Sequence, residues 1–559
     1  MRLQLIFVLG LALSANAALI EVYDEDINAG ETVHWTADNT YLMKEKVFVE
    51  DGALLIIDPG VVVKSEPHPG SQAVALIITR GGKIHADGTA ESPIVFTSIA
   101  DDLLPYDQTA LDVPNTTGLW GGVVILGNAV TNLAGGFGGV EGVDITDDRG
   151  QYGGTDDDDS SGVLRYVSIR FAGQEVMPDV ELNGLTMGAV GSRTVIEYVE
   201  VFNNADDAFE WFGGSVNTRY LLAVNCQDDG FDYDVGFRGR GQFWCCVHGN
   251  PGPDSRCGEH DGAVSPIDAP PYSIPVIANA TYIAKNDQIG TIMFRENAGG
   301  KYLNSIFHDA GDVFVKSEFA IDAEERFLAG DLMIADCIFW SAANPSSWSY
   351  YDPFSGPATD ALDAGRNIIY DPGLNCRTPR NYLKSPSGRL DFRPTADTVF
   401  TNITCADSVD TSGFIESVCF KGAFDPTQPM WVRGWTAFDH YGYLKAPGET
   451  PVASIPTDCC NPVKTAPAEI RSPAFTSCAA QLRATDNRLL VSCRASKGSR
   501  VSVTAFDMRG KLVAHAENVA VRTGMQLVPV HINAKALQAL VYHVSIDGVQ
   551  VLSTRALPK

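Results

Sequence analysis

An internal repeat constrains the fold of this chain more than any other feature. The stretch around Asn203 aligns with the stretch around Asn225, and Phe209 aligns with Phe231 at the same offset. A period of about 22 residues, built from short alternating strands, is typical of one coil of a parallel β-helix. Leucine-rich repeats have a similar period, but their Leu-x-x-Leu-x-Leu frame is absent. We therefore predict an all-β chain whose main body is a right-handed parallel β-helix solenoid with long loops.

Short apolar runs bounded by Gly, Asn and Asp extend this pattern over residues 18–445, which we expect to form the solenoid. Further coils are expected at residues 47–64, 75–97, 164–170 and 302–307. Stretches without the pattern are expected to project as long loops at residues 100–117, 134–162, 249–273 and 341–380.

The N-terminal segment, residues 1–17, has the order of a signal peptide. Arg2 supplies positive charge, residues 3–13 are mostly apolar, and Ala15-Asn16-Ala17 is a small-residue cleavage motif. We therefore predict an exported protein, either secreted or displayed at a bacterial cell surface. No later stretch has about 20 consecutive apolar residues, so no transmembrane helix is expected after the signal peptide.

The distribution of charge divides the remaining chain into two parts. The formal net charge is −28, but residues 462–559 contain 13 Lys or Arg and 5 Asp or Glu, so they carry +8 and the rest carries −36. Prolines punctuate residues 446–473, which we interpret as a linker before a small C-terminal β-sandwich at residues 474–559. The acidic body lacks the basic footprint that nucleic acids require, so no nucleic-acid partner is expected.

Three stretches resemble a family of exported bacterial β-helix proteins, namely residues 118–127, 154–170 and the paired coils at 198–243. The resemblance covers roughly residues 20–302. It implies a pectate-lyase-like solenoid located at the cell surface, and it implies no particular activity.

The C-terminal residues resemble a second family, the type IX secretion sorting domains. Residues 501–513, residues 541–552 and the terminal Lys559 carry this resemblance, although Leu540 stands where the family has Gly. The resemblance implies that the export machinery is a partner of this domain. An ordinary accessory β-sandwich is the alternative.

The repeat also predicts an acidic patch. If Phe209 and Phe231 point into the solenoid, Glu210 and Asp232 point outward and stack about 4.8 Å apart, with Asp234 beside them. Two carboxylates so close repel each other, so the pair needs a cation, an arginine or a raised pKa. Arg238 and Arg240 follow on the chain and are the expected partners.

Three interpretations of the patch remain open. Asn and Asp at repeated bends can hydrogen-bond their own backbone and shape the turn. Dense carboxylates on a rigid frame can bind calcium. The order of the acidic motifs also resembles that of polygalacturonase-type hydrolases, which implies catalytic candidates at Asp206, Asp228, Asp229 and His248, although the downstream Arg-x-Lys element of that family is absent. Paired carboxylates are the acid and base of glycoside hydrolysis.

A second acidic segment consists of Asp156, Asp157, Asp158 and Asp159, with Asp147 and Asp148 upstream in the same loop. A calcium ion would relieve the repulsion among these carboxylates. A solvated acidic loop is the alternative, in which the nearby Arg149 neutralises part of the charge.

All twelve cysteines follow the signal peptide, so disulfides are expected. The short intervening loops favour the pairs Cys405 with Cys419 and Cys478 with Cys493. Zinc is the alternative for the thiols and imidazoles of residues 245–260, whose spacing is not that of a standard zinc finger, and for these residues we favour disulfides.

The expected function is the binding of extracellular polysaccharide or matrix. Trp348 and its aromatic neighbours could stack on sugar rings. The alternative is a polysaccharide-cleaving hydrolase or lyase that uses the patch from Asp206 to Asp234. No P-loop, dinucleotide-binding fingerprint or Gly-x-Ser-x-Gly motif is present, so no organic cofactor is expected beside the calcium.

Overall fold

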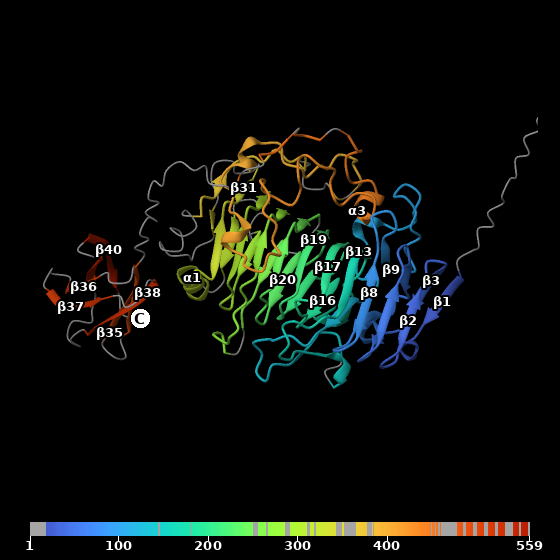
Figure 1. Ribbon diagram of the computed structural model, residues 1–559, viewed down its shortest axis with the longest axis horizontal. Coiled ribbons are helices and arrows are strands. Elements are labelled where there is room, and N and C mark those ends of the chain that lie inside the picture. The colour runs from blue at the N-terminus through green and yellow to red at the C-terminus, as the bar shows by residue number, and fades with distance from the viewer. Residues whose placement is uncertain are drawn as a thin grey trace, which may run out of the picture. The chain divides into compact units, whose positions relative to one another are not determined.

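Short parallel strands stack in three rows between residues 18 and 369 of the computed structural model (Figure 1). The structure describes residues 18–459, except 144–145, 179, 250–254, 264–265, 285–290, 310–312, 318–319, 342–348, 351–364, 377–382, 384, 449, 453 and 457–458. It also describes the backbone of the strands between residues 478 and 556. The predicted signal peptide and most of the predicted linker lie outside the described residues.

The β4 row is a ten-stranded parallel sheet. Its strands are β4 (Val47–Val49), β7 (Ala75–Ile78), β10 (Gly122–Leu126), β16 (Leu185–Gly188), β18 (Phe209–Phe212), β20 (Phe231–Asp234), β23 (Gly258–His260), β26 (Ile292–Phe294), β29 (Val313–Ser317) and β32 (Ser349–Tyr350).

Two further rows share three long strands, β13 (Gly162–Arg170), β17 (Val195–Phe202) and β19 (Asn217–Val224). The β1 row adds β1 (Ala18–Val22), β3 (Asn39–Met43), β6 (Val62–Ser65), β9 (Ile94–Ser98), β22 (Cys245–Val247), β25 (Thr281–Ile283), β28 (Ile306–His308), β31 (Ile338–Trp340) and β33 (Ile368–Ile369). The β2 row adds β2 (Thr32–Trp35), β5 (Leu54–Ile57), β8 (Lys83–Asp87), β21 (Arg240–Gln242), β24 (Val276–Ala278), β27 (Gly300–Leu303) and β30 (Leu332–Ala335).

Each long strand turns a corner at a tyrosine. Tyr166, Tyr198 and Tyr220 have positive φ angles of 48°, 54° and 58°. These values lie in the left-handed region, which residues other than glycine rarely adopt. Their rings stack on one another with centroids 4.4 and 4.3 Å apart. Stacking of equivalent residues on successive coils stabilises this strained corner, and it separates the β2 row from the β1 row.

The interior of the solenoid confirms the predicted register. Phe209 pairs with Phe231, and their buried rings stack 5.4 Å apart. Asn225 donates a hydrogen bond of 2.8 Å from its side-chain amide to the side-chain oxygen of Asn203, one coil earlier. The chain therefore folds as a parallel β-helix, with like residues stacked at the offset of the sequence repeat.

The prediction that coils continue to residue 445 is wrong. In the described residues, the last strand of the solenoid is β33, and the following segment packs against the outer side of the β1 row. Tyr441 lies against the rings of Phe171 and Phe202, with centroids 6.4 and 5.6 Å away. The buried Glu200 accepts hydrogen bonds from the amides of Ala437 and Phe438, which begin the short helix α3 (Ala437–His440). Figure 1 shows α3 beside the β-helix.

Besides short 3-10 helices, the described residues of this part also contain four shorter strands and one further α-helix. They are β11 (Gly138–Gly139), β12 (Gln151–Tyr152), β14 (Glu175–Met177), β15 (Val180–Glu181) and α1 (Ala320–Ala329). No helix in the described part of the chain is long and apolar enough to cross a membrane.

The C-terminal strands form a separate compact unit with two antiparallel sheets. One contains β34 (Cys478–Arg483), β35 (Arg488–Ala495) and β38 (Gly524–His531). The other contains β37 (Leu512–Val519), β36 (Arg500–Asp507), β39 (Leu540–Ile546) and β40 (Val549–Ala556). Cys478 stands opposite Cys493 in the β34–β35 pair, as their predicted disulfide requires. The side chains of these two residues lie outside the described part, so the disulfide stays a prediction, as does the sandwich.

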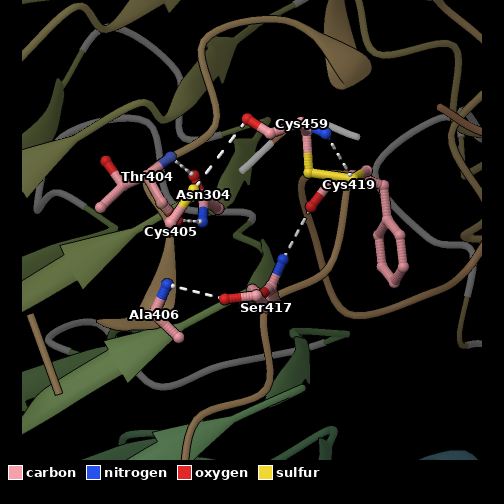
Figure 2. Close-up of a disulfide and its surroundings, with 9 residues drawn as sticks. Asn304, Thr404, Cys405, Ala406, Ser417, Cys419 and Cys459 are labelled. Carbon is pink, nitrogen blue, oxygen red and sulfur yellow. Dashed lines mark hydrogen bonds between the residues drawn. A yellow bond between two sulfur atoms is a disulfide. The ribbon is translucent and has the colours of Figure 1, made fainter. Parts of the chain in front are cut away.

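The predicted Cys405–Cys419 disulfide is wrong, because Cys419 is bonded to Cys459 (Figure 2). Cys405 is also disulfide-bonded, but not to Cys419. The prediction paired Cys405 with Cys419 because they are close in sequence. In the fold, the segment that carries Cys459 lies beside Cys419 instead. Six other cysteines of the described part are buried free thiols, contrary to the expectation of disulfides: Cys226, Cys245, Cys246, Cys257, Cys337 and Cys376.

Replacing Phe231 with Ala tests the aromatic core. Removal of a fully buried phenylalanine typically costs about 3–5 kcal/mol, so the free energy of unfolding should fall by an amount of this order. Denaturant unfolding followed by circular dichroism measures it. Phe137→Ala, at a half-exposed ring, is the control and should cost far less. Equal losses in both variants would contradict the assignment of Phe231 to the core.

Candidate functional site

The outward positions of the β4 row change character along the solenoid. One line of outward positions, paired in register from strand to strand, begins with Ile77 and Val124 on the early coils and continues with Thr186 on β16. The next coils place Glu210 and then Asp232 in the same line, and Glu259 follows on β23. The outer face is therefore apolar at its beginning and acidic from β18 to β23, and Met293 follows on β26.

A loop covers the apolar part of this face. Val140, Val143 and Tyr152 pack in one buried cluster with Ile77 and Val124. The ring of Tyr152 also stacks on the half-buried Phe212, with centroids 5.8 Å apart. Phe212 is in register with Asp234, so this aromatic pair lies where the covered face meets the acidic face.

Carboxylates converge in two overlapping groups at this position. Asp206, Asp207 and Asp228 bring oxygen atoms within 4.8 Å of one another, and so do Asp207, Glu210 and Asp232. Asp228 is exposed, whereas Asp206 and Glu210 are partly buried. The predicted stacking of Glu210 on Asp232 is confirmed, but Asp232 does not face solvent as expected, because it is only 9% exposed.

Burial and mutual repulsion disfavour the charged forms of these groups. Burial and the neighbouring Asp228 raise the pKa of Asp206 to about 8. Burial first, and then repulsion from neighbouring carboxylates, raises the pKa values of Asp207, Glu210 and Asp232 well above their ordinary range. Burial also raises the pKa of Asp234 to about 7. At neutral pH the cluster therefore holds protons or a cation.

The predicted arginine partners of the patch are wrong. Arg238 pairs with Asp157 at 2.8 Å, and Arg240 pairs with Asp410 at 2.5 Å. Both contacts join residues far apart in the chain, which the repeat could not reveal.

Two other arginines lie on the far side of the acidic face. Arg256 contacts Glu259 at 2.7 Å, and Arg295 contacts Asp261 at 2.6 Å and Glu259 at 3.1 Å. Burial raises the pKa of Glu259 to about 7 against the opposing effect of both arginines. Sequence analysis missed these residues as parts of the patch. The coil that separates Asp232 from its partner Glu259 is longer than the repeat, so the repeat alone does not align them.

Backbone hydrogen bonds account for part of the acidic repeat. A side-chain oxygen of Asp207 accepts a hydrogen bond of 2.7 Å from the amide of Asp229, and Asp229 accepts one from the amide of Arg256. The turn-shaping interpretation therefore holds for Asp207 and Asp229. Asp206 is also near a backbone amide, that of Asp207, whereas the carboxylate of Asp228 is exposed.

His248 lies behind the acidic face rather than among the carboxylates that converge on it. Its ring is buried, and Nε2 lies 2.6 Å from the backbone carbonyl of Arg256. Its potential ligand atom converges with the thiols of Cys246 and Cys257. Trp348, the predicted sugar-stacking residue, lies outside the described residues.

The carboxylates of the segment Asp156–Asp159 hold neighbouring loops together through hydrogen bonds and an ion pair. Asp157 accepts a hydrogen bond from the amide of Val130 as well as from Arg238, and Asp159 accepts one from the amide of Asn128. Asp158 accepts a hydrogen bond from the hydroxyl of Ser192, and Asp156 accepts one from the amide of Asp158. In the described part of the chain, these four carboxylates do not converge as a group of metal ligands. Calcium binding here stays a prediction.

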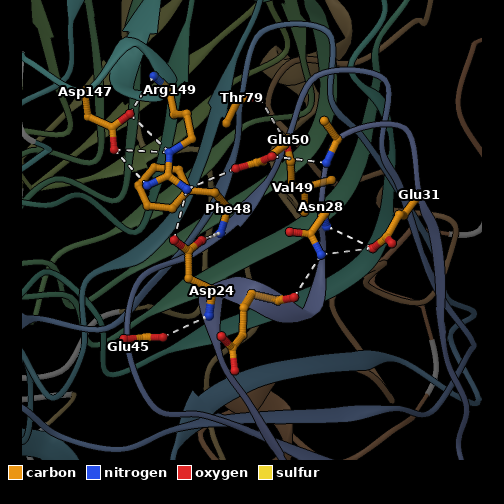
Figure 3. Close-up of polar contacts among 12 residues, drawn as sticks. Asp24, Asn28, Glu31, Glu45, Phe48, Val49, Glu50, Thr79, Asp147 and Arg149 are labelled. Atoms are coloured by element: carbon orange, nitrogen blue, oxygen red, sulfur yellow. Dashed lines mark hydrogen bonds and ion pairs between the residues drawn. The ribbon is translucent and has the colours of Figure 1, made fainter.

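Arg149 neutralises part of the charge of its own acidic loop, as expected, through Asp147, and it also contacts two acids of the first coils. Its guanidinium contacts Asp147 at 2.8 Å, Asp24 at 2.9 Å and Glu50 at 3.1 Å, and it lies over the ring of Phe48 (Figure 3). These contacts of Arg149 hold the loop that carries Asp147 against the first coils. They thereby fix the loop that covers the apolar part of the β4 row.

Comparison with known proteins agrees with this architecture. A family model described as a pectate-lyase-like β-helix domain matches residues 27–353. The chain belongs to this family. Among solved structures, the crystal structure of the Acinetobacter phage vB_ApiP_P1 tailspike protein is similar at 8% identity and a TM-score of 0.25, with 92% of this chain and 82% of that chain covered. No curated protein matches the chain.

Melting temperature as a function of pH tests the protonation of the acidic face. Between about pH 4, the ordinary pKa of a carboxyl group, and about pH 8, the folded protein binds protons that the unfolded chain releases. Stability should therefore fall as the pH rises through this window. Calcium should raise the melting temperature more at pH 8 than at pH 5, and Asp232→Asn should reduce that rise. Asp38→Asn, an exposed carboxylate on an early coil, is the control. A calcium effect unchanged in Asp232→Asn would contradict cation binding at this face.

Proposed function

We propose that this β-helix binds an extracellular polysaccharide along the acidic face of the β4 row. The observation that carries the proposal is the position of the half-buried Phe212 beside Asp234 and Glu210, at the edge of the covering loop. Aromatic faces stack on the apolar sides of sugar rings, and carboxylates accept hydrogen bonds from sugar hydroxyls. Phe212 supplies the first of these contacts and the acids supply the second.

The charge of the face favours a neutral glycan. Arg256 and Arg295 are both engaged with acids at the far end of the patch, so a polyanion would meet repulsion from those carboxylates around the exposed Asp228 that are ionised. An acidic glycan would need a divalent cation between its carboxylates and those of the protein. The two classes of glycan are therefore distinguished by their dependence on calcium.

A glycan array probed with the full-length protein, with and without calcium, tests this proposal. We expect binding to a neutral polysaccharide that survives chelation of calcium. Phe212→Ala should weaken this binding about tenfold, since a lost stacking contact costs about 1 kcal/mol or more. Asp38→Asn serves again as the control and should bind normally. Normal binding by Phe212→Ala would reject this face as the binding surface.

Hydrolysis of the bound glycan is the second candidate function. One observation favours it: Asp206, with a raised pKa of about 8, lies within the same group as the exposed Asp228. A protonated carboxyl next to an ionised one can serve as general acid and nucleophile or base. His248 takes no part in this candidate, because it is buried behind the wall.

An activity screen for new reducing ends separates binding from cleavage. If the protein is a hydrolase, Asp206→Asn and Asp228→Asn should each lower the rate by about 100-fold or more, while binding persists. Asp157→Asn is the matched control, because this carboxylate pairs with Arg238 away from the group. Binding without release of reducing ends by the unmodified protein would reject the hydrolase.

We also propose that the protein is exported and that the C-terminal unit is its sorting signal. Deletion of residues 473–559 should then leave the β-helix folded but retained in the periplasm. Surface labelling of intact cells measures display, and protease resistance of the retained protein verifies folding. Normal display of the shortened protein would reject the sorting role.

A further inference from the structure

Three soft metal ligands converge inside the wall behind the acidic face. One potential ligand atom from each of Cys246, His248 and Cys257 lies within 4.8 Å of the other two, and all three residues are buried. Neither the binding nor the hydrolysis proposed above uses any of them. We propose that Cys246, His248 and Cys257 bind a zinc ion that holds this part of the solenoid wall together.

The fold brings the three residues together from two strands of different rows. Cys246 lies in β22, in register with Ala223 on the previous coil and Tyr282 on the next. His248 follows the same strand, and its amide bonds to the carbonyl of Ile283. Cys257 directly precedes β23 in the β4 row. A metal here would join the β1 row to the β4 row within one coil.

The hydrogen bonding of His248 suits a metal ligand. Its Nε2 lies 2.6 Å from the carbonyl oxygen of Arg256. A carbonyl can only accept, so Nε2 carries the proton, and in the neutral ring Nδ1 then has the lone pair. Histidines that bind zinc usually donate their other ring proton to a carbonyl or carboxylate in this way, which fixes both the tautomer and the orientation of the ring.

The surrounding backbone leaves room for sulfur. A Cβ atom at Gly230 would lie 2.7 Å from Sγ of Cys246 and 2.9 Å from the carbonyl oxygen of Cys257. Both contacts are shorter than real Cβ atoms tolerate, so only glycine fits beside this cluster. The segment before Cys257 is also fixed, because the amide of Arg256 donates to the buried carboxylate of Asp229.

The charge of this ligand set suits zinc. Two cysteine thiolates and one neutral imidazole around Zn²⁺ have no net charge, so their burial avoids the cost of an isolated ion. Binding releases the two thiol protons to water.

A disulfide between Cys246 and Cys257 is the rival arrangement for an exported chain. Both residues are free thiols in the structure. A disulfide would leave His248 without a function in the cluster, whereas zinc uses all three side chains. The two arrangements exclude each other, so the state of these thiols decides between them.

Metal analysis of the full-length protein, purified under reducing conditions and loaded with zinc, tests the proposal. We expect about one tightly bound zinc per chain. Cys257→Ser and His248→Ala should each lose most of this zinc. Cys245→Ser is the matched control, since its buried thiol lies on the adjacent position of β22, outside the cluster, and it should keep the metal.

Cobalt substitution keeps the proposal testable if the variants fail to fold. The unmodified protein loaded with Co²⁺ should show thiolate-to-cobalt charge-transfer absorption, and X-ray absorption should find sulfur and nitrogen ligands. Absence of the charge-transfer bands would overturn the proposal. So would a Cys246–Cys257 disulfide found by peptide mass analysis of the protein as secreted. Loss of zinc without loss of glycan binding would leave the function proposed above intact.

Discussion

The in-register hydrogen bonding of parallel strands is the constraint on which the rest of this structure depends. Each residue of β18 lies directly opposite one residue of β20, about 4.8 Å away. Like therefore stacks on like at the repeat offset. For Phe209 on Phe231 and for Asn203 on Asn225 the result is favourable, because rings stack and amides hydrogen-bond. For Glu210 on Asp232 the same register forces two carboxylates together at a cost. A fold that retains such a cost at one place suggests that the place has a function.

The features that were predicted correctly from the sequence are those that depend on the register between successive coils. The constant offset of the repeat was sufficient to place Phe209 and Phe231 inside, and to stack Glu210 on Asp232. The prediction failed where partners come from outside the repeat. Arg238 and Arg240 reach acids 81 and 170 residues away, in a loop and in the C-terminal segment of the β-helix unit. No periodic pattern encodes such contacts, because they depend on how non-repeating segments return to the wall.

The same limit explains why the extent of the solenoid was overestimated. The segment that follows β33 is rich in aromatic residues and turns, as the coils are. In its described residues it forms no coil, because its apolar side chains pack on the outside of the β1 row, where Trp431 and Trp435 contact the Tyr198 ring. One outer face is thus covered by this segment. On the β4 row, the loop that carries Tyr152 covers the apolar coils, and the acidic face begins beside this loop.

The acidic face and the sulfur cluster behind it are connected through one residue. The amide of Arg256 binds Asp229, its carbonyl binds His248, and its guanidinium contacts Glu259. An interaction that holds His248 and Cys257 in place therefore also holds Arg256, which partly neutralises the outer carboxylates. If the three soft ligands were free to move, Glu259 would lose a positioned cation, and its raised pKa would rise further, since Arg256 is the largest of the effects that lower it. The rigidity of the wall and the charge of its outer face are consequently coupled, although the two sets of ligands have opposite preferences, soft sulfur inside and hard oxygen outside.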